Sequence, residues 1–143
     1  MLNDDDLNRY ARQVIIPNFE EEGQENLLNT KCLIVGAGGL GCPVALYASA
    51  AGFGHIEIYD EDIIEISNLN RQIAHKNNHI GNNKAENLVQ ECIKINPNIS
   101  IISKKKFFDR TIDVSNFDFR FRRSNGRTIS DLEKRIKQRI SLL

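Results

Sequence analysis

The stretch Lys31-Cys32-Leu33-Ile34-Val35-Gly36-Ala37-Gly38-Gly39-Leu40-Gly41 decides the fold of this 143-residue chain. Its first five residues form a short apolar run that ends at a glycine, which predicts a buried parallel strand. The next six residues match the pattern Gly-x-Gly-x-x-Gly, and residues 40–51 are small and apolar, as in a helix packed on a sheet. In this context backbone N–H groups can approach a phosphate, and the N-terminus of the helix adds a favourable dipole. We expect a nucleotide-binding loop, and the alternative is a tight turn with a purely structural role.

The segments around this stretch alternate between strand and helix patterns. Residues 55–60 and 99–103 are expected to form strands, and a helix capped by Asn82 or Asn83 is expected to run to Asn96. Two helices are expected before the first strand, over residues 5–13, capped by one of the aspartates at 4–6, and around residues 21–28. Ser67 is expected to cap a short helix that carries the polar residues after it. This order predicts an α/β fold, a Rossmann-like parallel sheet with flanking helices.

The pattern weakens toward the C-terminus. Residues 116–119 could open a fourth strand, but residues 120–127 are too charged for a buried one. Residues 130–133 form a capping-box pattern that leads into a basic amphipathic helix. Residues 1–100 hold 7 Lys and Arg against 14 Asp and Glu, whereas residues 101–143 hold 12 against 5. The sequence therefore predicts an N-terminal helical arm (1–30), a Rossmann-like nucleotide-binding domain (31–118) and a basic tail (119–143).

The composition excludes several classes of protein. Cys32, Cys42 and Cys92 are widely spaced and predict neither a disulfide framework nor a zinc site, so we expect small buried hydrophobic residues. The chain has no apolar run of membrane-spanning length and no signal-peptide pattern, so the default location is the cytoplasm. The basic tail with Phe119 and Phe121 could bind nucleic acid or a membrane surface, but charge runs are usually solvated. We therefore expect neither partner.

Polar residues after the second strand indicate which nucleotide is bound. Asp60 ends that strand nineteen residues after Gly41, where a carboxylate can accept hydrogen bonds from ribose hydroxyls. Asp62 either supports the site or is a solvated turn residue. The following segments carry amide and basic side chains suited to a triphosphate, namely Asn68, Arg71, Gln72 and Lys84. This cluster favours ATP over NAD, because dinucleotide oxidoreductases bind pyrophosphate mainly through backbone amides.

Together these motifs resemble the MoeB/ThiF/HesA family of adenylyltransferases, which shares its fold with ubiquitin-activating enzymes. The resemblance covers about residues 7–103 and rests on ordered motifs. These are Arg9-Tyr10-Ala11-Arg12-Gln13-Val14-Ile15, Gly23-Gln24-Glu25, the loop at 36–41, Asp60-Glu61-Asp62, Ser67-Asn68-Leu69-Asn70-Arg71-Gln72 and Gly81-Asn82-Asn83-Lys84.

The resemblance implies a reaction and a set of roles. In such enzymes ATP and Mg²⁺ meet the C-terminal carboxylate of a ubiquitin-like sulfur-carrier protein of molybdopterin or thiamine biosynthesis. The carboxylate attacks the α-phosphate and forms an acyl-adenylate and pyrophosphate. Arg12, Arg71 and Lys84 would be catalytic, with Arg12 reaching into the site of a second copy in a homodimer. The nucleotide would be bound by Gly36, Gly38, Gly39, Gly41, Asp60, Asp62, Asn68, Arg71 and Lys84.

The chain also departs from the family pattern. Phe117-Asp118-Phe119 looks like the start of the next family strand, but the aspartate that binds magnesium at its end has no counterpart, so no metal ligand is assigned. The crossover-loop cysteine, two Cys-x-x-Cys pairs and carrier-docking strands have no counterpart either. We therefore expect a truncated family member whose tail arose by a truncation or shift of the reading frame. The alternatives are an inactive remnant that at most binds nucleotide and a fragment of an NAD-binding oxidoreductase.

Overall fold

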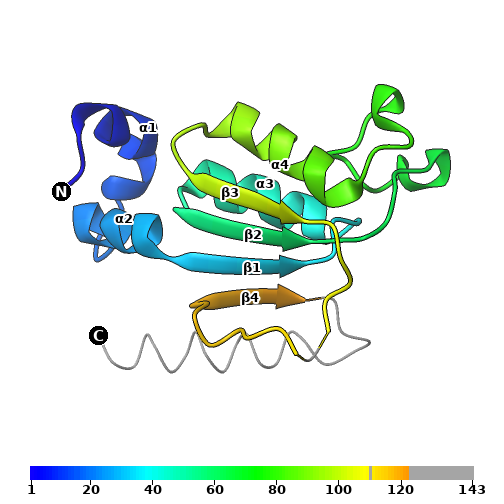
Figure 1. Cartoon of the computed structure of the whole chain (residues 1–143). Helices are drawn as coiled ribbons and strands as arrows, with labels where there is room; N and C mark the ends of the chain where they lie inside the picture. Colours follow the sequence, from blue (N-terminus) through cyan, green and yellow to red (C-terminus); the bar gives the residue numbers. More distant parts are fainter. Residues whose placement is uncertain (110, 123–143) are drawn as a thin grey trace.

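The computed structural model describes residues 1–109 and 111–122. Four parallel strands form one sheet in the order β3-β2-β1-β4 (Figure 1). They are β1 (Lys31–Val35), β2 (His55–Tyr59), β3 (Ser100–Lys104) and β4 (Phe119–Arg122). The predicted Rossmann-like α/β sheet is therefore confirmed, and the first three strands lie within one residue of their expected positions.

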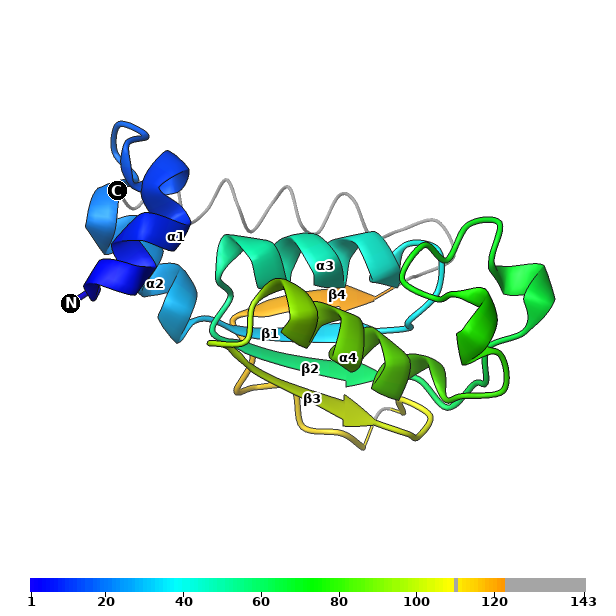
Figure 2. The same cartoon turned by 90° about the horizontal axis from the view of Figure 1, so that it is seen from above.

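Helices cover one face of this sheet. The connections from β1 to β2 and from β2 to β3 contain α3 (Gly41–Ala51) and α4 (Lys84–Ile95), which lie side by side on the same face (Figure 2). Right-handed crossovers that step in one direction along a sheet place their helices on one face. The described part of the connection from β3 to β4, residues 105–109 and 111–118, lies on the other face (Figure 2).

The core lies between the sheet and these two helices. Side chains alternate along a strand, so Cys32 and Ile34 of β1 point to the helices together with Ile56 and Ile58 of β2. All four are at most 1% exposed. Cys42 and Cys92 of the helices complete the same cluster, and all three cysteines are buried and free, as expected. Burial raises the pKa of the Cys32 thiol to about 12, so it is a packing residue rather than a nucleophile.

The fourth strand corrects the expectation that the charge after residue 119 excludes a place in the sheet. β4 pairs with β1 in parallel, with Phe119 opposite Cys32 and Arg122 opposite Val35. Its two phenylalanines, Phe119 and Phe121, are half-buried against the core. The arginines alternate to the opposite face, where the Arg122 guanidinium lies 5.7 Å from the centre of the Phe108 ring. Arg122 is exposed, whereas Arg120 is half-buried and its Nε has no hydrogen-bond partner among the described residues.

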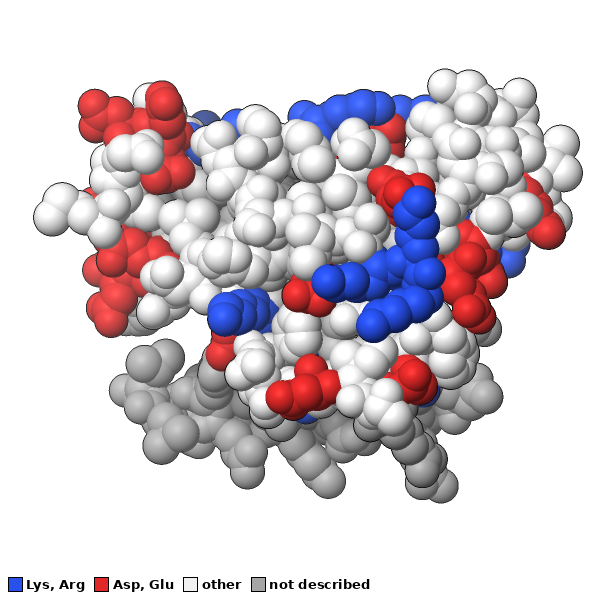
Figure 3. All heavy atoms as spheres, viewed as in Figure 1, with Lys and Arg blue, Asp and Glu red and all other residues white. Residues whose placement is uncertain are grey.

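Two N-terminal helices lie at the end of the sheet where the strands begin. They are α1 (Asp4–Val14) and α2 (Glu20–Asn29), both acidic in the first turn, and acidic side chains gather at this end of the molecule (Figure 3). The cap of α1 is Asn3, whose side chain accepts a hydrogen bond from the Asp6 N–H, so the three aspartates follow the cap instead of forming it. Asn83 caps α4 in the same way, as one of the two expected asparagines.

Two further expectations have different outcomes. Ser67 does not cap a helix, because Glu65 is the cap of the 3₁₀ turn Ile66–Asn68. The basic amphipathic helix expected after residue 130 lies outside the described residues. None of the helices within residues 1–109 and 111–122 is long and apolar enough to cross a membrane.

Candidate nucleotide-binding site

The glycine loop joins β1 to α3 at the carboxyl end of the sheet. Gly36 has a φ of +100°, a conformation that side chains disfavour, and its N–H donates to the Tyr59 carbonyl at 2.8 Å. Gly41 begins α3 so close to the loop that a Cβ there would lie 1.8 Å from the Gly36 carbonyl oxygen. By contrast, the nearest heavy atom to a Cβ on Gly38 would be 3.7 Å away. Two of the glycines are therefore needed for the shape of the loop itself.

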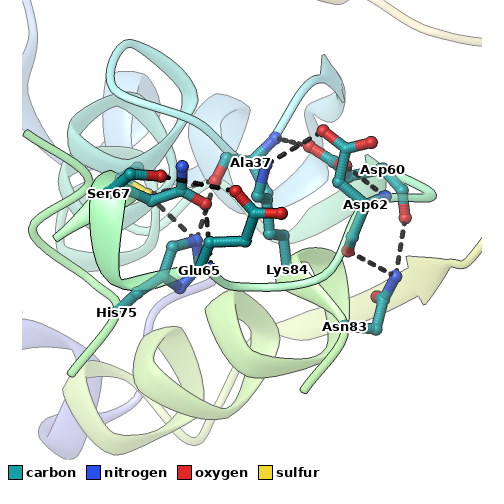
Figure 4. A network of polar contacts seen from close by, with 10 residues as sticks. Ala37, Asp60, Asp62, Glu65, Ser67, His75, Asn83 and Lys84 are labelled. Carbon is teal, nitrogen blue, oxygen red and sulfur yellow. Dashed lines mark hydrogen bonds and ion pairs between the residues drawn. The ribbon is translucent and has the colours of Figure 1, made fainter. Parts of the chain in front are cut away.

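Polar groups hold the loop from behind. The Ala37 N–H donates to Oδ2 of Asp60 at 2.6 Å, and the Asp62 N–H donates to Oδ1 of the same carboxylate at 2.9 Å (Figure 4). The Ala37 carbonyl oxygen lies 2.9 Å from Nε2 of His75. In this structure Asp60 therefore orders the loop, in addition to the ribose contact that the sequence predicts for it.

A cavity of about 560 Å³ opens beside the loop and collects the predicted nucleotide-binding residues. Its lining consists of Val35, Gly36, Gly38, Gly39, Leu40, Gly41, Asp60, Asp62, Asn68, Arg71, Gln72, Lys84 and Phe121. All nine residues assigned to the nucleotide from the sequence are among them. Their individual roles in binding stay predictions.

Two cations reach this cavity from different segments. Lys84, at the start of α4, is only 8% exposed, and its Nζ lies 2.9 Å from Oδ2 of Asp62 (Figure 4). Arg71 is exposed, and its guanidinium donates to the Ser67 carbonyl and to Oδ1 of Asn70, each at 3.0 Å. The Arg71 stem passes Gly39, since a Cβ on that glycine would lie 3.3 Å from its Cγ. The cavity therefore contains two cations next to the loop, balanced by the carboxylates of Asp60 and Asp62.

Asn68 and Gln72 are the amide side chains of the cavity, and both are buried. Oδ1 of Asn68 accepts a hydrogen bond from the Glu65 N–H at 3.1 Å, so this residue also shapes its own turn. Gln72 is 4% exposed, and its Oε1 has no hydrogen-bond partner among the described residues. A buried acceptor without a partner is costly, and this one lies beneath the surface of the cavity, while Nε2 of Gln72 is the atom nearest to a Cβ on Gly38.

The structure adds two residues that were not assigned from the sequence, Phe121 in the lining of the cavity and His75 against the glycine loop. Gln72, which belongs to the polar cluster identified in the sequence, also lines the cavity. Phe121 enters the cavity only because β4 lies beside β1, which no local pattern reveals. His75 carries no signal in the sequence, since a lone histidine is indistinguishable from an ordinary core residue.

Arg12 lies apart from the cavity. It is exposed on α1, at the end of the sheet opposite the glycine loop (Figure 1). Its neighbours attach the helix to the domain: Arg9 donates to the Ile95 carbonyl at 3.1 Å, and Gln13 donates to Oε1 of Gln24 at 2.8 Å. Tyr10 is 1% exposed, and its hydroxyl accepts from the Asn96 amide at 2.8 Å. Arg12 is therefore one of the exposed residues of this motif, together with Arg9, Ala11 and Ile15.

Comparisons with known proteins agree with this geometry. A profile of the ThiF family matches residues 10–121. "Adenylyltransferase and sulfurtransferase MOCS3" of Arabidopsis thaliana is 43% identical over 100 residues, which are 70% of this chain and 22% of that protein. The protein of the same name from Drosophila sechellia is 47% identical over 100 residues, with the same coverage of 70% and 22%.

The fold is also similar to that of solved structures. Crystalline PaaA has a TM-score of 0.69 at 29% identity and covers 76% of this chain and 36% of its own. Escherichia coli MccB, crystallised with ATP, has a TM-score of 0.57 at 33% identity over 64% of this chain and 25% of its own. The chain thus spans about a fifth of the length of the two curated relatives. On the sequence match over residues 10–121 and the shared fold, the chain belongs to the ThiF family.

Proposed function

We propose that this chain carries the nucleotide-binding part of an ATP-dependent adenylyltransferase that activates the C-terminal carboxylate of a ubiquitin-like sulfur carrier. The observation that carries the proposal is the cavity in which the glycine loop, Asp60, Arg71 and Lys84 meet. Two features fit ATP. The loop and the two cations suit its phosphates, and the carboxylate of Asp60 at the end of β2 suits its ribose. The names of the MOCS3 relatives and the ATP complex of MccB support the same reading.

The chemistry is a displacement at the α-phosphate. The carrier carboxylate forms a bond to phosphorus, the bond to pyrophosphate breaks, and an acyl-adenylate results. The glycine loop would hold the phosphates by backbone N–H groups, and Asp60 would accept from the ribose. Lys84 would exchange its contact with Asp62 for phosphate oxygens, and Arg71 would neutralise charge that develops at phosphorus. The contribution of these residues is positioning and charge neutralisation.

Magnesium would accompany the triphosphate, and the described residues hold no preformed cluster of ligands for it. No group of three or more His, Cys, Asp or Glu side chains in residues 1–109 and 111–122 is placed to hold a metal ion. Asp60 and Asp62 already accept hydrogen bonds from the loop and from Lys84. We therefore assign no step to the metal.

The deciding experiment measures ATP binding and ATP–pyrophosphate exchange by the chain with a sulfur-carrier protein. We expect ATP to bind, and exchange to depend on the carrier. Binding without exchange would favour the alternative of a remnant that only holds nucleotide. Tighter binding of NAD than of ATP would contradict the proposal.

Replacement of Arg71 by alanine tests the phosphate role in the same assay. We expect the affinity for ATP to fall on the order of tenfold, since a charge-assisted hydrogen bond contributes roughly 1.5–3 kcal/mol. Lys94→Ala is the matched control, because it removes a positive charge that pairs with Glu91 outside the cavity. Equal ATP affinity in the Arg71→Ala variant and the unchanged chain would refute the assigned role.

Arg12 is proposed to act in a second copy of the chain. Its exposure at the end of the sheet opposite the glycine loop supports action in trans. We expect Arg12→Ala and Lys84→Ala variants each to lose exchange, and a mixture of the two to recover part of it, because mixed dimers contain one site with both residues. Mixtures no more active than the separate variants would contradict a shared site.

A further inference from the structure

His75 lies behind the glycine loop and is absent from the lining of the cavity. It is 4% exposed, and its Nε2 lies 2.9 Å from the Ala37 carbonyl oxygen (Figure 4). A carbonyl oxygen only accepts hydrogen bonds, so Nε2 carries the proton in this contact. The imidazole therefore donates to the backbone of the predicted phosphate-binding loop.

Asn87 fixes the other side of the imidazole. Its Nδ2 lies 2.8 Å from Nδ1 of His75 and also donates to the Ala74 carbonyl at 3.3 Å. The contact with Ala74 sets the orientation of the amide, so Nδ2 faces the ring and Nδ1 must accept. His75 is thus held as the neutral tautomer with its proton on Nε2.

The hydrogen bond from His75 determines where the next N–H group of the loop points. In a trans peptide the carbonyl of one residue and the N–H of the following residue point in opposite directions. Because His75 holds the Ala37 carbonyl toward the protein interior, the Gly38 N–H is turned the other way, and Gly38 lines the cavity. Asp60 fixes the preceding peptide through the Ala37 N–H at 2.6 Å. Both peptides next to Ala37 are therefore held before a ligand arrives.

We propose that neutral His75 is a positioning residue for nucleotide binding, which aims the Gly38 N–H at a phosphate by holding the Ala37 carbonyl. This inference rests on the proposed nucleotide site. It adds a residue that touches neither nucleotide nor carrier and acts only through the loop. It also makes binding sensitive to protonation of the ring.

The surroundings of the ring favour the neutral form. Burial is the main cause that lowers the pKa of His75, and the charges of Lys84 and His79 lower it further. The hydrogen bond to the Ala37 carbonyl and the charge of Asp60 raise it, but by less. The Cys42 thiol, 3.8 Å from Nε2, has its own pKa raised to about 11 by burial and stays uncharged. Protonation would put a hydrogen on Nδ1 opposite the Asn87 amide hydrogens. The Asn87 amide would then have to rotate and lose its hydrogen bond to the Ala74 carbonyl.

The first test needs no substitution. Nitrogen-15 NMR of the imidazole in the full chain reports which nitrogen carries the proton at pH 7.5, and we expect Nε2. A proton on Nδ1, or on both nitrogens, would overturn the proposal. This measurement is independent of nucleotide, so it separates failure of the inference from failure of the proposed function.

The second test compares His75→Leu with His75→Gln. Leucine removes the donor, whereas the glutamine amide can still donate to the Ala37 carbonyl. We expect His75→Leu to weaken ATP binding on the order of tenfold and to shift the Gly38 amide resonance, and His75→Gln to restore most of both. Unchanged ATP affinity and an unchanged Gly38 resonance in His75→Leu would refute the proposal, as would equal losses in the two variants.

The third test uses pH. The pKa of His75 is lowered, so stability falls as pH drops below the ordinary value of 6.5, and ATP affinity falls at lower pH, as the ring of the folded chain becomes protonated. We expect this fall to be steeper in the unchanged chain than in His75→Gln, which cannot titrate. Protonation of ATP itself affects both proteins equally. Identical pH profiles would count against the proposal.

Discussion

Gly41→Ala is expected to lower the free energy of unfolding by about 3 kcal/mol or to prevent folding, because a Cβ has no room at this position. The added carbon would lie 1.8 Å from the Gly36 carbonyl oxygen and 3.7 Å from the Ile34 side chain. The near atom belongs to the backbone of a tight turn, so it cannot rotate away. Urea unfolding followed by circular dichroism measures the loss.

Gly38→Ala is the matched control for this substitution. Its Cβ would have no heavy atom nearer than 3.7 Å, so we expect the free energy of unfolding to change by less than about 0.5 kcal/mol. The same methyl group would occupy the side of the loop that lines the cavity, so ATP affinity should fall while stability does not. Equal stability of the Gly41→Ala and Gly38→Ala variants would contradict the packing argument.

Asp60→Ala is expected to weaken ATP binding by at least tenfold and to destabilise the fold by about 1–3 kcal/mol. Two backbone donors lose their acceptor, the Ala37 N–H at 2.6 Å and the Asp62 N–H at 2.9 Å. Ala37 is 0% exposed, so water does not replace the lost acceptor. Removal of a negative charge near the phosphates acts in the opposite direction. We expect the loss of the ordered loop and of the ribose contact to outweigh it.

Glu61→Ala is the control. It also removes one negative charge, at the neighbouring position, but the Glu61 side chain does not line the cavity. Isothermal titration with ATP and urea unfolding separate the effects on affinity and on stability. If Asp60→Ala bound ATP more tightly than the unchanged chain, charge repulsion would dominate and the assigned role of Asp60 would be wrong.

Local patterns were sufficient for most of the fold. The apolar run of β1, the glycine loop and the cap of α4 each depend on interactions within a few residues, and all were found in place. The expectation for β4 failed in part, because the charge of residues 120–122 was weighed without their alternation. The two phenylalanines lie on the face that packs on the core, and the two arginines alternate to the other face, where Arg122 stacks on Phe108.

The candidate site was predictable where its residues follow the strand ends. The carboxyl ends of parallel strands meet at one edge of the sheet, so Asp60 and the glycine loop had to come together. The position of Arg12 was not predictable in this way, because the packing of α1 against α2 and against the end of α4 determines it.

The sequence by itself determined a strand, a glycine loop and a helix in the order that binds a phosphate, and with them the ThiF-family fold. Only the tertiary structure decided how that loop is held. Asp60 contacts Ala37 across 23 residues and His75 does so across 38, and neither distance is a period of a helix or a strand. The physical reason is that hydrogen bonds and burial depend on position in space. A buried peptide group is therefore matched to its partner only when the whole sheet and its helices have assembled.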